Sequence, residues 1–280
     1  MQYVDPVVIQ VAETKLVADG VDALQMELGV PGWTTDAKTD AEELIEIAGR
    51  LCYKSFGTEL NANLTKVREG NQSYIGNILN VKHGSVLEHS SVSFALLNVS
   101  RIFTHELVRH RQGTAFSQES GRFVRIDKIR MPKSEVMTEA FFAKHICVGT
   151  NSDIDPKESL HVTQEGIHNA MDGIEELIQG LNSLIHDNMP FSIKKRITSF
   201  IRRFSPNGQV NDIMLTMNHR AARYLIQQRT AEGAEEEIRL VFGIIATQLA
   251  LRYPAIYQDM ETRSAADSST PVFTFKNEKV

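Results

Sequence analysis

The sequence predicts a mixed α/β fold, because apolar residues recur with two different periods along its 280 residues. Between Ile167 and Ile185 they recur every three or four positions, as on one face of a long helix. Residues 91–97 and 121–127 instead have the composition and alternation of strands. With 42% hydrophobic residues, the chain can bury a sizeable core as one large domain or two small ones.

Two helices are predicted before the first strand. One runs to about Tyr53, with Thr39 or Asp40 as its N-cap. Cys52 lies in this amphipathic segment, and we interpret it as a small core residue. The other helix is predicted over residues 71–81.

A helical pattern follows the first strand and carries basic residues. Arg101, His105 and Arg109 are spaced at i, i+4 and i+8, so a helix places them on one face. A polar loop and the strand 121–127 come next. Together these elements are expected to bring the polar groups toward one pocket.

The second half is predicted to be mainly helical. Residues 151–158 are polar and are expected to form a loop before the long helix. A further helix carries Lys195 and Arg202, which are two turns apart and point the same way. The remaining predicted elements are a strand over 209–216, a helix over 218–229, a helix that opens at Glu235 and ends near Pro254, and a polar, mobile tail from Thr262.

Charge is distributed unevenly along the chain. The net charge is -5, yet residues 101–133 contain eight basic and three acidic residues, and Lys194, Lys195, Arg196, Arg202 and Arg203 form a second basic island. Local positive charge in an acidic protein favours a bounded anion, such as a nucleotide, over a general nucleic-acid polymer.

Several classes are excluded or disfavoured by the sequence. No apolar run is long enough to cross a membrane and no signal-peptide pattern opens the chain. Two cysteines, Cys52 and Cys147, fit a reducing cytoplasm, so we expect a cytosolic protein. The glycine motifs of Rossmann and P-loop sites are missing. His105-Glu106 begins a zinc-protease pattern, but position 109 is arginine, so we expect no metal.

The most informative segment is Arg109-His110-Arg111, followed by Ser120 and Arg122. Guanidinium groups are always charged and hold phosphate or carboxylate bidentately, so the segment suits a large anionic ligand. A solvated helix face and a nucleic-acid-binding patch are the alternative interpretations.

Motifs elsewhere in the chain extend this pattern. They are His83-Gly84-Ser85 with Glu88-His89, Arg202 four residues before Pro206, and Asn218-His219-Arg220 with the later Arg229. In this order the motifs resemble those of the flavin-dependent thymidylate synthases, over about residues 40 to 260. The resemblance implies that family's fold, with a central sheet flanked by long helices. It also implies an N-terminal extension (1–40), a synthase domain (41–260) and a flexible tail (261–280).

The resemblance further implies reductive methylation of dUMP to dTMP. Methylenetetrahydrofolate supplies the carbon, NADPH is the reductant, and bound FAD mediates without a cysteine nucleophile. It implies a homotetramer with active sites where subunits meet, and no nucleic-acid or membrane partner.

The family pattern assigns residues to two ligands. Arg229 is expected to be catalytic, because a fixed cation beside uracil favours its anion. The residues expected to bind dUMP are Arg101, Glu106, Arg109, Gln118, Glu119, Ser120, Gly121, Arg122, Lys195, Arg202 and Arg229. The residues expected to bind FAD are His83, Ser85, Arg109, His110, Arg111, Gln118, Asn218, Arg220 and Tyr224.

This sequence departs from the family pattern in its loop and leaves two rivals. Eight residues separate Arg111 from Ser120 where seven are usual, so the segment 112–118 is aligned backwards from the serine. Glu106 stands where some members have glutamine, and Tyr224 where histidine or asparagine is frequent. The rival functions are a non-catalytic nucleotide- or RNA-binding protein and a flavoprotein of this fold with another substrate.

Overall fold

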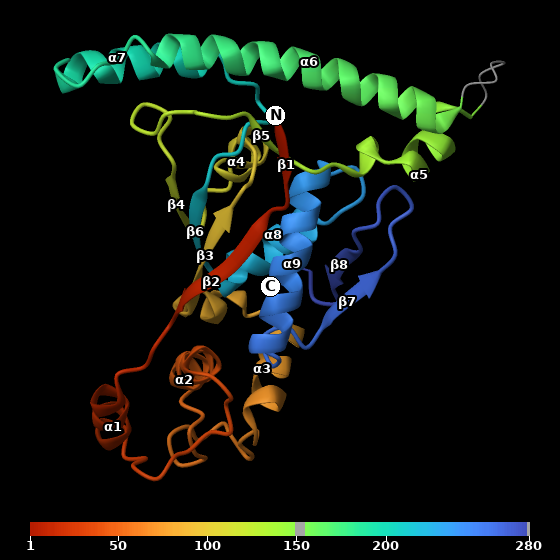
Figure 1. The fold of residues 1–280 in the computed structure, drawn as a ribbon. Helices are drawn as coiled ribbons and strands as arrows, with labels where there is room; N and C mark the ends of the chain where they lie inside the picture. Colours follow the sequence, from red (N-terminus) through yellow and green to blue (C-terminus); the bar gives the residue numbers. More distant parts are fainter. Residues whose placement is uncertain (149–154, 279–280) are drawn as a thin grey trace. The chain divides into compact units, whose positions relative to one another are not determined.

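The computed structural model describes residues 1–148 and 155–278 (Figure 1). The chain forms two compact units, each assembled from separate segments. The first unit consists of Met1–Val7, Ala95–Arg109 and Phe116–Met214, and the second of Val8–Phe94, His110–Ala115 and Leu215–Val280.

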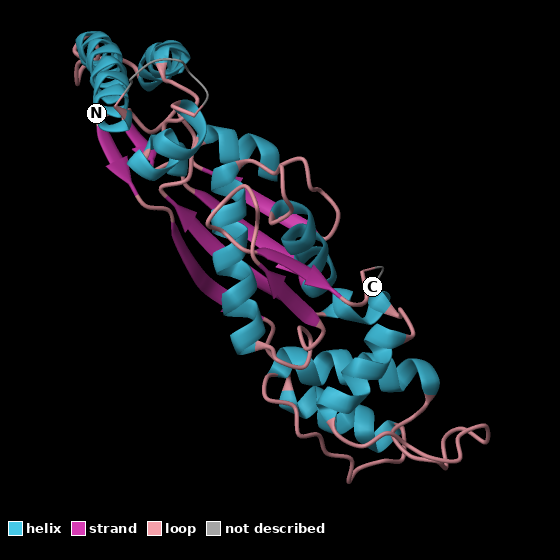
Figure 2. Cartoon of the chain, turned by 90° about the vertical axis from the view of Figure 1, so that its right-hand side faces the viewer, coloured by secondary structure: helices cyan, strands magenta, loops and turns pink. Residues whose placement is uncertain are grey.

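A four-stranded sheet has the order β2-β3-β6-β4, and each of its strands has residues in both units. Its strands are β2 (Val7–Glu13), β3 (Ser91–Leu97), β6 (Ile213–Asn218) and β4 (Thr114–Gln118), drawn in magenta in Figure 2. Along β3 and β6 every second residue is buried, because successive side chains of a strand point to opposite faces. This pattern packs one face of the sheet and leaves the other partly open.

The first unit is built mainly from helices. They are α4 (Arg101–Leu107), η2 (Glu135–Met137), α5 (Glu139–Phe141), the π-helix η3 (Phe142–Ile146), α6 (Pro156–Asn182), α7 (Phe191–Ile201) and η4 (Arg202–Phe204). Strand β1 (Gln2–Val4) pairs in parallel with β5 (Arg130–Pro132). Ile178 of α6 and Ile201 of α7 meet Ile129 in its apolar core.

The second unit holds the other helices and a strand pair. The helices are α1 (Ala18–Glu27), α2 (Asp40–Tyr53), α3 (Asn71–Asn80), η1 (Gly84–His89), α8 (His219–Arg229) and α9 (Glu236–Arg252). Strands β7 (Met260–Arg263) and β8 (Val272–Phe275) pair antiparallel. Side-chain caps start α2, α8 and α9: Thr39 accepts from Glu42 N, Asn218 from Ala221 N, and Glu235 from Glu237 N and Ile238 N.

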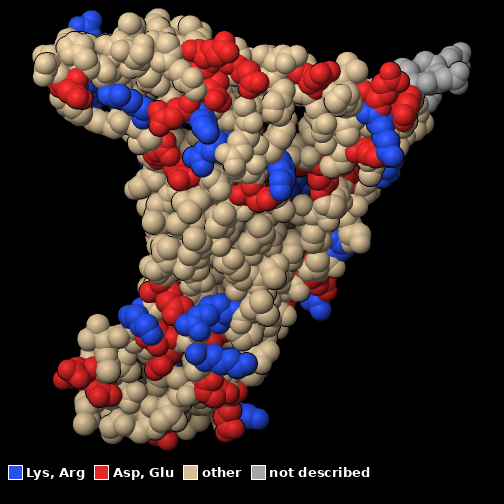
Figure 3. Space-filling model, viewed as in Figure 1, with Lys and Arg blue, Asp and Glu red and all other residues tan. Residues whose placement is uncertain are grey.

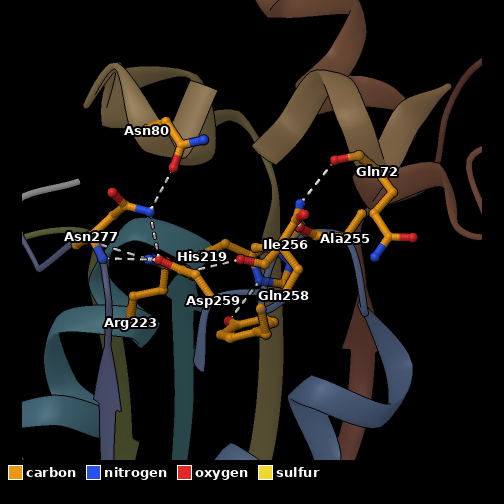
Figure 4. A network of polar contacts seen from close by, with 10 residues as sticks. Gln72, Asn80, His219, Arg223, Ala255, Ile256, Gln258, Asp259 and Asn277 are labelled. Carbon is orange, nitrogen blue, oxygen red and sulfur yellow. Dashed lines mark hydrogen bonds and ion pairs between the residues drawn. The ribbon is translucent and has the colours of Figure 1, made fainter. Parts of the chain in front are cut away.

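A buried polar network stabilises the second unit (Figure 4). Arg223 donates to both carboxylate oxygens of Asp259, at 2.7 and 3.0 Å, and to the carbonyl of Ile256 at 2.9 Å. Asn277 donates its backbone N–H to the same carboxylate. Burial favours the neutral acid, but the bonds and charge of Arg223 outweigh it and lower the pKa of Asp259. The network thus ties the C-terminal segment to α8.

The structure differs from the sequence prediction around the basic motif. Helix α4 ends at Leu107, so Arg109 lies outside the helical face predicted for it. Residues 121–124 form a turn and 125–127 have no regular structure, where a strand was predicted; the carbonyl of Ser120 accepts from Phe123 N and Val124 N. The strand β4 lies instead within the predicted polar loop.

Other boundaries also differ. Pro156 opens α6, so residues 156–158 are helical where a loop was predicted, and positions 151–154 of that loop lie outside the described residues. The strand predicted over 209–216 is displaced to β6. Cys52 is exposed, so its interpretation as a core residue was wrong.

The C-terminal segment predicted as a polar, mobile tail contains the end of β7 and the whole of β8. Val272, Phe273 and Phe275 are buried there, so the segment contributes apolar core. The division into extension, domain and tail itself stays a prediction. Over the described residues, no helix combines the length and apolar character that a membrane span requires.

Candidate active site

A basic cavity of about 570 Å³ lies in the first unit. Four residues expected to bind dUMP line it: Arg101, Glu119, Gly121 and Arg202. The sequence assignment missed further cations on its wall, which are Arg125, Lys128, Arg130 and Arg203. The runs 125–130 and 202–203 were visible as local positive charge, so the charge pattern was the signal that could have assigned them to the site.

Backbone hydrogen bonds position the cations of this cavity. Ser100 caps α4 by accepting from Phe103 N at 3.0 Å, and Arg101 N donates to the carbonyl of Gln209 at 3.1 Å. The side chain of the buried Gln209 accepts from Arg130 N at 3.1 Å. These bonds fix the backbone positions from which the side chains of Arg101 and Arg130 extend. Such fixed positions preorganise a binding site.

The arginines of the cavity lack acidic partners. Within residues 1–148 and 155–278, Arg101, Arg202 and Arg203 form no salt bridge, and all three are exposed. Uncompensated guanidinium groups that share one cavity repel one another, and a bound anion relieves that repulsion. The cavity therefore suits a phosphate or carboxylate group.

Two acids, Glu119 and Asp127, also line this cavity. Burial first, and then the charge of Asp212, raise the pKa of the Glu119 carboxyl. Its carbonyl accepts from Asn211 Nδ2 at 3.1 Å, and its backbone N–H donates to the carbonyl of Asp212 at 2.8 Å. Gln118 Nε2 donates to Thr104 Oγ1 at 2.9 Å and also to Asn211 Oδ1. These hydrogen bonds therefore hold Glu119 beside the cations that line the cavity.

The turn after β4 carries Ser120, Gly121 and Arg122. The hydroxyl of Ser120 accepts weakly from Arg122 N at 3.4 Å. Arg122 does not line the first cavity with Gly121; it lines a second cavity of about 490 Å³ together with Lys195. Lys195 and Arg202, expected to point the same way, thus line different cavities, because the helix tightens to a 3₁₀ turn at Arg202.

Several residues expected to bind flavin lie in the second unit. Arg229 Nε donates to His110 Nε2 at 2.8 Å, and the rings of His110 and Tyr224 are 6.1 Å apart. The structure therefore brings the expected catalytic arginine next to two expected flavin residues. The RHR motif itself is divided, with Arg109 in the first unit and His110 in the second.

The turn before β4 is tied to the start of α8. Gly113 has a φ of +69°, and its carbonyl accepts from Asn218 N at 3.0 Å. A Cβ there would lie 2.7 Å from Asn218 Nδ2, so the position requires glycine for space as well as conformation. Asn218 is thereby fixed as the cap of α8, and its side-chain oxygen is already occupied by Ala221 N.

The remaining expected site residues are placed individually. Tyr53 hydrogen-bonds to His83 Nδ1, and the two rings stack with centroids 5.6 Å apart. Arg220 pairs with Glu88. Tyr53 and Glu88 are thus site neighbours that were not assigned from the sequence. Ser85, Arg109 and Arg111 are exposed, and Glu106 is half-buried.

The fold and the cavity define a class of protein: an α/β protein that presents unpaired arginines to a bounded anion. The sequence matches the family described as thymidylate synthase complementing protein (Thy1) over residues 35–255. The chain therefore belongs to the Thy1 family.

Sequence similarity to individual proteins supports this family assignment. The chain is 34% identical over 241 residues to a flavin-dependent thymidylate synthase of Mycobacterium tuberculosis, covering 85% of this chain and 86% of the relative. It is 33% identical over 237 residues to the flavin-dependent thymidylate synthase of Mycobacterium avium, with the same coverage. Among solved structures it resembles the UMP/dUMP methylase PolB from Streptomyces cacaoi bound with 5-Br dUMP, with a TM-score of 0.54. At 17% identity over 92% of this chain and 95% of that one, the likeness concerns the fold alone.

Proposed function

We propose that this chain is a flavin-dependent thymidylate synthase that converts dUMP to dTMP. In this proposal methylenetetrahydrofolate supplies the carbon and NADPH the reducing equivalents. The observation that carries the proposal is the cavity of unpaired arginines in a chain of the Thy1 family. A nucleotide monophosphate matches such a cavity, because several fixed guanidinium groups suit a phosphate dianion.

In the first unit, binding is assigned to the basic cavity. Arg101 and Arg202 hold the phosphate of dUMP, and the backbone at Gly121 allows close approach. Of the other residues expected to bind dUMP, Arg109, Ser120 and Arg122 stay assigned from the family pattern. Glu106 is assigned to a sugar hydroxyl or a neighbouring arginine.

Catalysis is assigned to Arg229. A guanidinium beside the uracil ring favours the ionised base and makes C5 more nucleophilic. His110 Nε2 accepts from Arg229 Nε, so His110 orients the guanidinium. The exposed Cys52 is not needed as a nucleophile in this scheme.

The second unit offers a donor set that fits FAD. Arg111 is exposed and forms no salt bridge within the described residues, which suits a diphosphate. Tyr224 and His110 supply ring surfaces, and His83 and Ser85 supply polar groups. When bound, the flavin supplies the redox chemistry and the transfer of the one-carbon unit.

The test is an anaerobic absorption spectrum followed by product analysis. Purified protein with FAD should show a flavin spectrum that bleaches with NADPH, and dTMP should then form from dUMP and methylenetetrahydrofolate. Arg229→Ala should lose about 100-fold or more in turnover while still binding FAD and dUMP, and Arg229→Lys should recover part of it. Protein that neither binds FAD nor forms dTMP would contradict the proposal.

A homotetramer is part of the proposal. Ile9 and Val11 on β2 are 44% and 51% exposed, and Figure 3 shows few charged side chains over this strand. An uncharged face with exposed aliphatic side chains is typical of a subunit interface. Light scattering after size exclusion should give about four times the 31.4 kDa chain mass, whereas a monomer at micromolar concentration would contradict it. A cytosolic location belongs to the same proposal.

A further inference from the structure

Helix α8 in the second unit contains three residues of the proposed flavin and uracil sites. Arg220 and Tyr224 are expected to bind FAD, Arg229 is assigned to catalysis, and none of the three is buried. A hydrogen-bonded helix of 11 residues moves as one body, so fixing its first turn fixes all three side chains. The residues that hold this first turn therefore set the geometry of the site.

His219 is the first residue of α8, and its side chain is fully buried in the second unit. His219 Nδ1 and the hydroxyl of Tyr257 share a hydrogen bond of 2.9 Å. The imidazole also lies edge-on to the rings of Tyr253 and Tyr257, with centroids 4.7 and 5.7 Å apart. Edge-to-face contacts and a directed hydrogen bond leave the ring one orientation. They fix the start of α8 on the segment 253–257.

Main-chain bonds at the same turn reach the two other motifs expected to bind FAD. His219 N donates to the carbonyl of Ser90 at 3.1 Å, directly after η1 and the segment 83–89. Asn218 N donates to the carbonyl of Gly113 at 3.0 Å, shortly after the RHR motif. Because these donors are consecutive residues, a displacement of His219 disturbs both connections.

The side chain of Arg220 extends the connection to η1 but is a weak anchor by itself. It pairs with Glu88, and the two side chains are 41% and 42% exposed. Exposed ion pairs hold their geometry poorly, because solvent screens them. The buried anchors are His219 and, one turn later, Arg223, which binds Asp259 in the network of Figure 4. The direction of Arg220 therefore depends on the buried residues beside it.

Packing alone does not call for an imidazole at this position. His219 Nε2 is buried and has no hydrogen-bond partner in the part of the chain that the structure describes. A buried polar atom without a partner costs free energy, and an apolar ring would fill the space without that cost. What the imidazole adds over an apolar ring is its bond to Tyr257.

We propose that His219 is a positioning residue of the flavin site. Through its bond to Tyr257 it holds the first turn of α8 in the place that aligns Arg220 with the other residues expected to bind FAD. It does not touch the ligand, because its side chain is buried. This inference rests on the proposed function, to which the flavin assignment belongs.

The test is a double-mutant cycle on the full-length protein with His219→Phe, Tyr257→Phe and the variant that carries both changes. Each single variant leaves one buried polar group without its partner, so Tm should fall, and the double variant should recover part of that loss. The affinity for FAD, measured by quenching of flavin fluorescence, should fall about three- to tenfold in all three variants. Affinity that stays low while Tm recovers separates positioning from packing.

The matched control is Thr39→Ala, which removes the N-cap of α2 in the same unit. Thr39 bonds to Glu42 and Glu43 of that helix, so the change lowers Tm without removing a bond of α8. Its affinity for FAD should equal that of wild type.

Hydrogen exchange before FAD is added gives a readout that needs no ligand. Tyr257→Phe leaves the sequence of the first turn of α8 unchanged, so intrinsic exchange rates there stay the same. The amides of Asn218 and Ala221, which bond to Gly113 and to the cap, should exchange faster than in wild type. Helix α6 of the first unit should exchange as in wild type.

Three results would overturn His219 as a positioning residue: wild-type FAD affinity in His219→Phe, FAD affinity that recovers with Tm in the double variant, or unchanged exchange in Tyr257→Phe. Wild-type protein that binds no FAD would overturn the proposed function as well. Protein that binds FAD but forms no dTMP overturns the proposed function alone, since the variants then still bind FAD more weakly than wild type.

Discussion

Two arginines of the second unit and two of the first are used in opposite ways. In the second unit, Arg223 and Arg50 are buried, and each pairs with a carboxylate, Asp259 and Glu46 respectively. In the first unit, Arg101 and Arg202 are exposed, line a cavity and have no acidic partner among the described residues. Residue type alone therefore does not distinguish a structural cation from a binding cation. Burial and pairing do.

The largest expected effect is on the buried pair. Asp259→Ala leaves Arg223 buried without its carboxylate and should lower the free energy of unfolding by about 3–5 kcal/mol. Urea unfolding followed by circular dichroism measures it. The matched control is Asp5→Ala, which breaks an exposed pair with Lys133 and should hardly move the midpoint. Equal destabilisation by both variants would break the comparison.

The counterpart in the first unit is Arg202→Ala. It should weaken dUMP binding by about 10- to 100-fold, because a hydrogen bond between charged groups is lost. The unfolding midpoint should stay unchanged, since Arg202 forms no salt bridge within the described residues. Calorimetry measures the affinity, with Arg263→Ala as a control that should bind normally. A large loss of stability in Arg202→Ala would make this arginine structural after all.

The pH dependence of the free energy of unfolding tests the burial of His219 in the polar network. Burial, and then the charge of Arg223, lower the pKa of His219 to about 3, whereas it is near 6.5 in the unfolded chain. The unfolded chain therefore binds one more proton between these values, so stability is complete above pH 6.5 and falls as the pH drops. The slope from this group is up to about 1.4 kcal/mol per pH unit.

His219→Gln should remove that contribution. Unfolding measured at pH 7.5, 6.5 and 5.5 should lose stability with falling pH in wild type and lose less in the variant. The carboxylates titrate in both proteins and cancel in the difference. Parallel curves would mean that His219 is protonated in the folded state, contrary to its complete burial and its bond to Tyr257 at 2.9 Å.

The smallest effect is expected at Glu119, one of the two acids that line the basic cavity. Glu119→Gln removes a negative charge next to the phosphate and should strengthen dUMP binding about two- to fivefold at pH 7.5. Because the pKa of Glu119 is raised, lowering the pH protonates it early, and the gain over wild type should shrink. Weaker binding in the variant would give Glu119 a direct role in holding the nucleotide.

Periodicity predicted the helices well and the strands less well. The segments now seen as α2, α3, α8 and α9 were located from capping residues and apolar spacing, which are local properties. Residues 121–127 alternate in sequence but form a turn and an irregular segment, because alternation does not supply a neighbouring strand to pair with. Strand β4 has polar residues and depends on β6 beside it.

The site was likewise predicted only in part, because the sequence shows local charge and spacing but not which distant segments become neighbours. The charge pattern located Arg101 and Arg202, and both line the first cavity. Which cavity each cation lines depends on helix ends and turns, so the spacing of Lys195 and Arg202 did not reveal that they line different cavities. Tyr53 was not found, since its contact with His83 joins residues thirty positions apart and leaves no spacing signal.

Each unit is built from segments that are far apart in the sequence, and this affects how the chain folds during its synthesis on the ribosome. The last segment of the second unit begins at residue 215 and contains Arg223, its partner Asp259, and Asn277, which donates to Asp259. A nascent chain therefore cannot complete this unit until residue 277 has emerged, although Val8–Phe94 was made long before. During that interval the apolar surface of the early segment is uncovered. Synthesis rate and chaperone access, rather than final stability alone, then set the yield of folded enzyme.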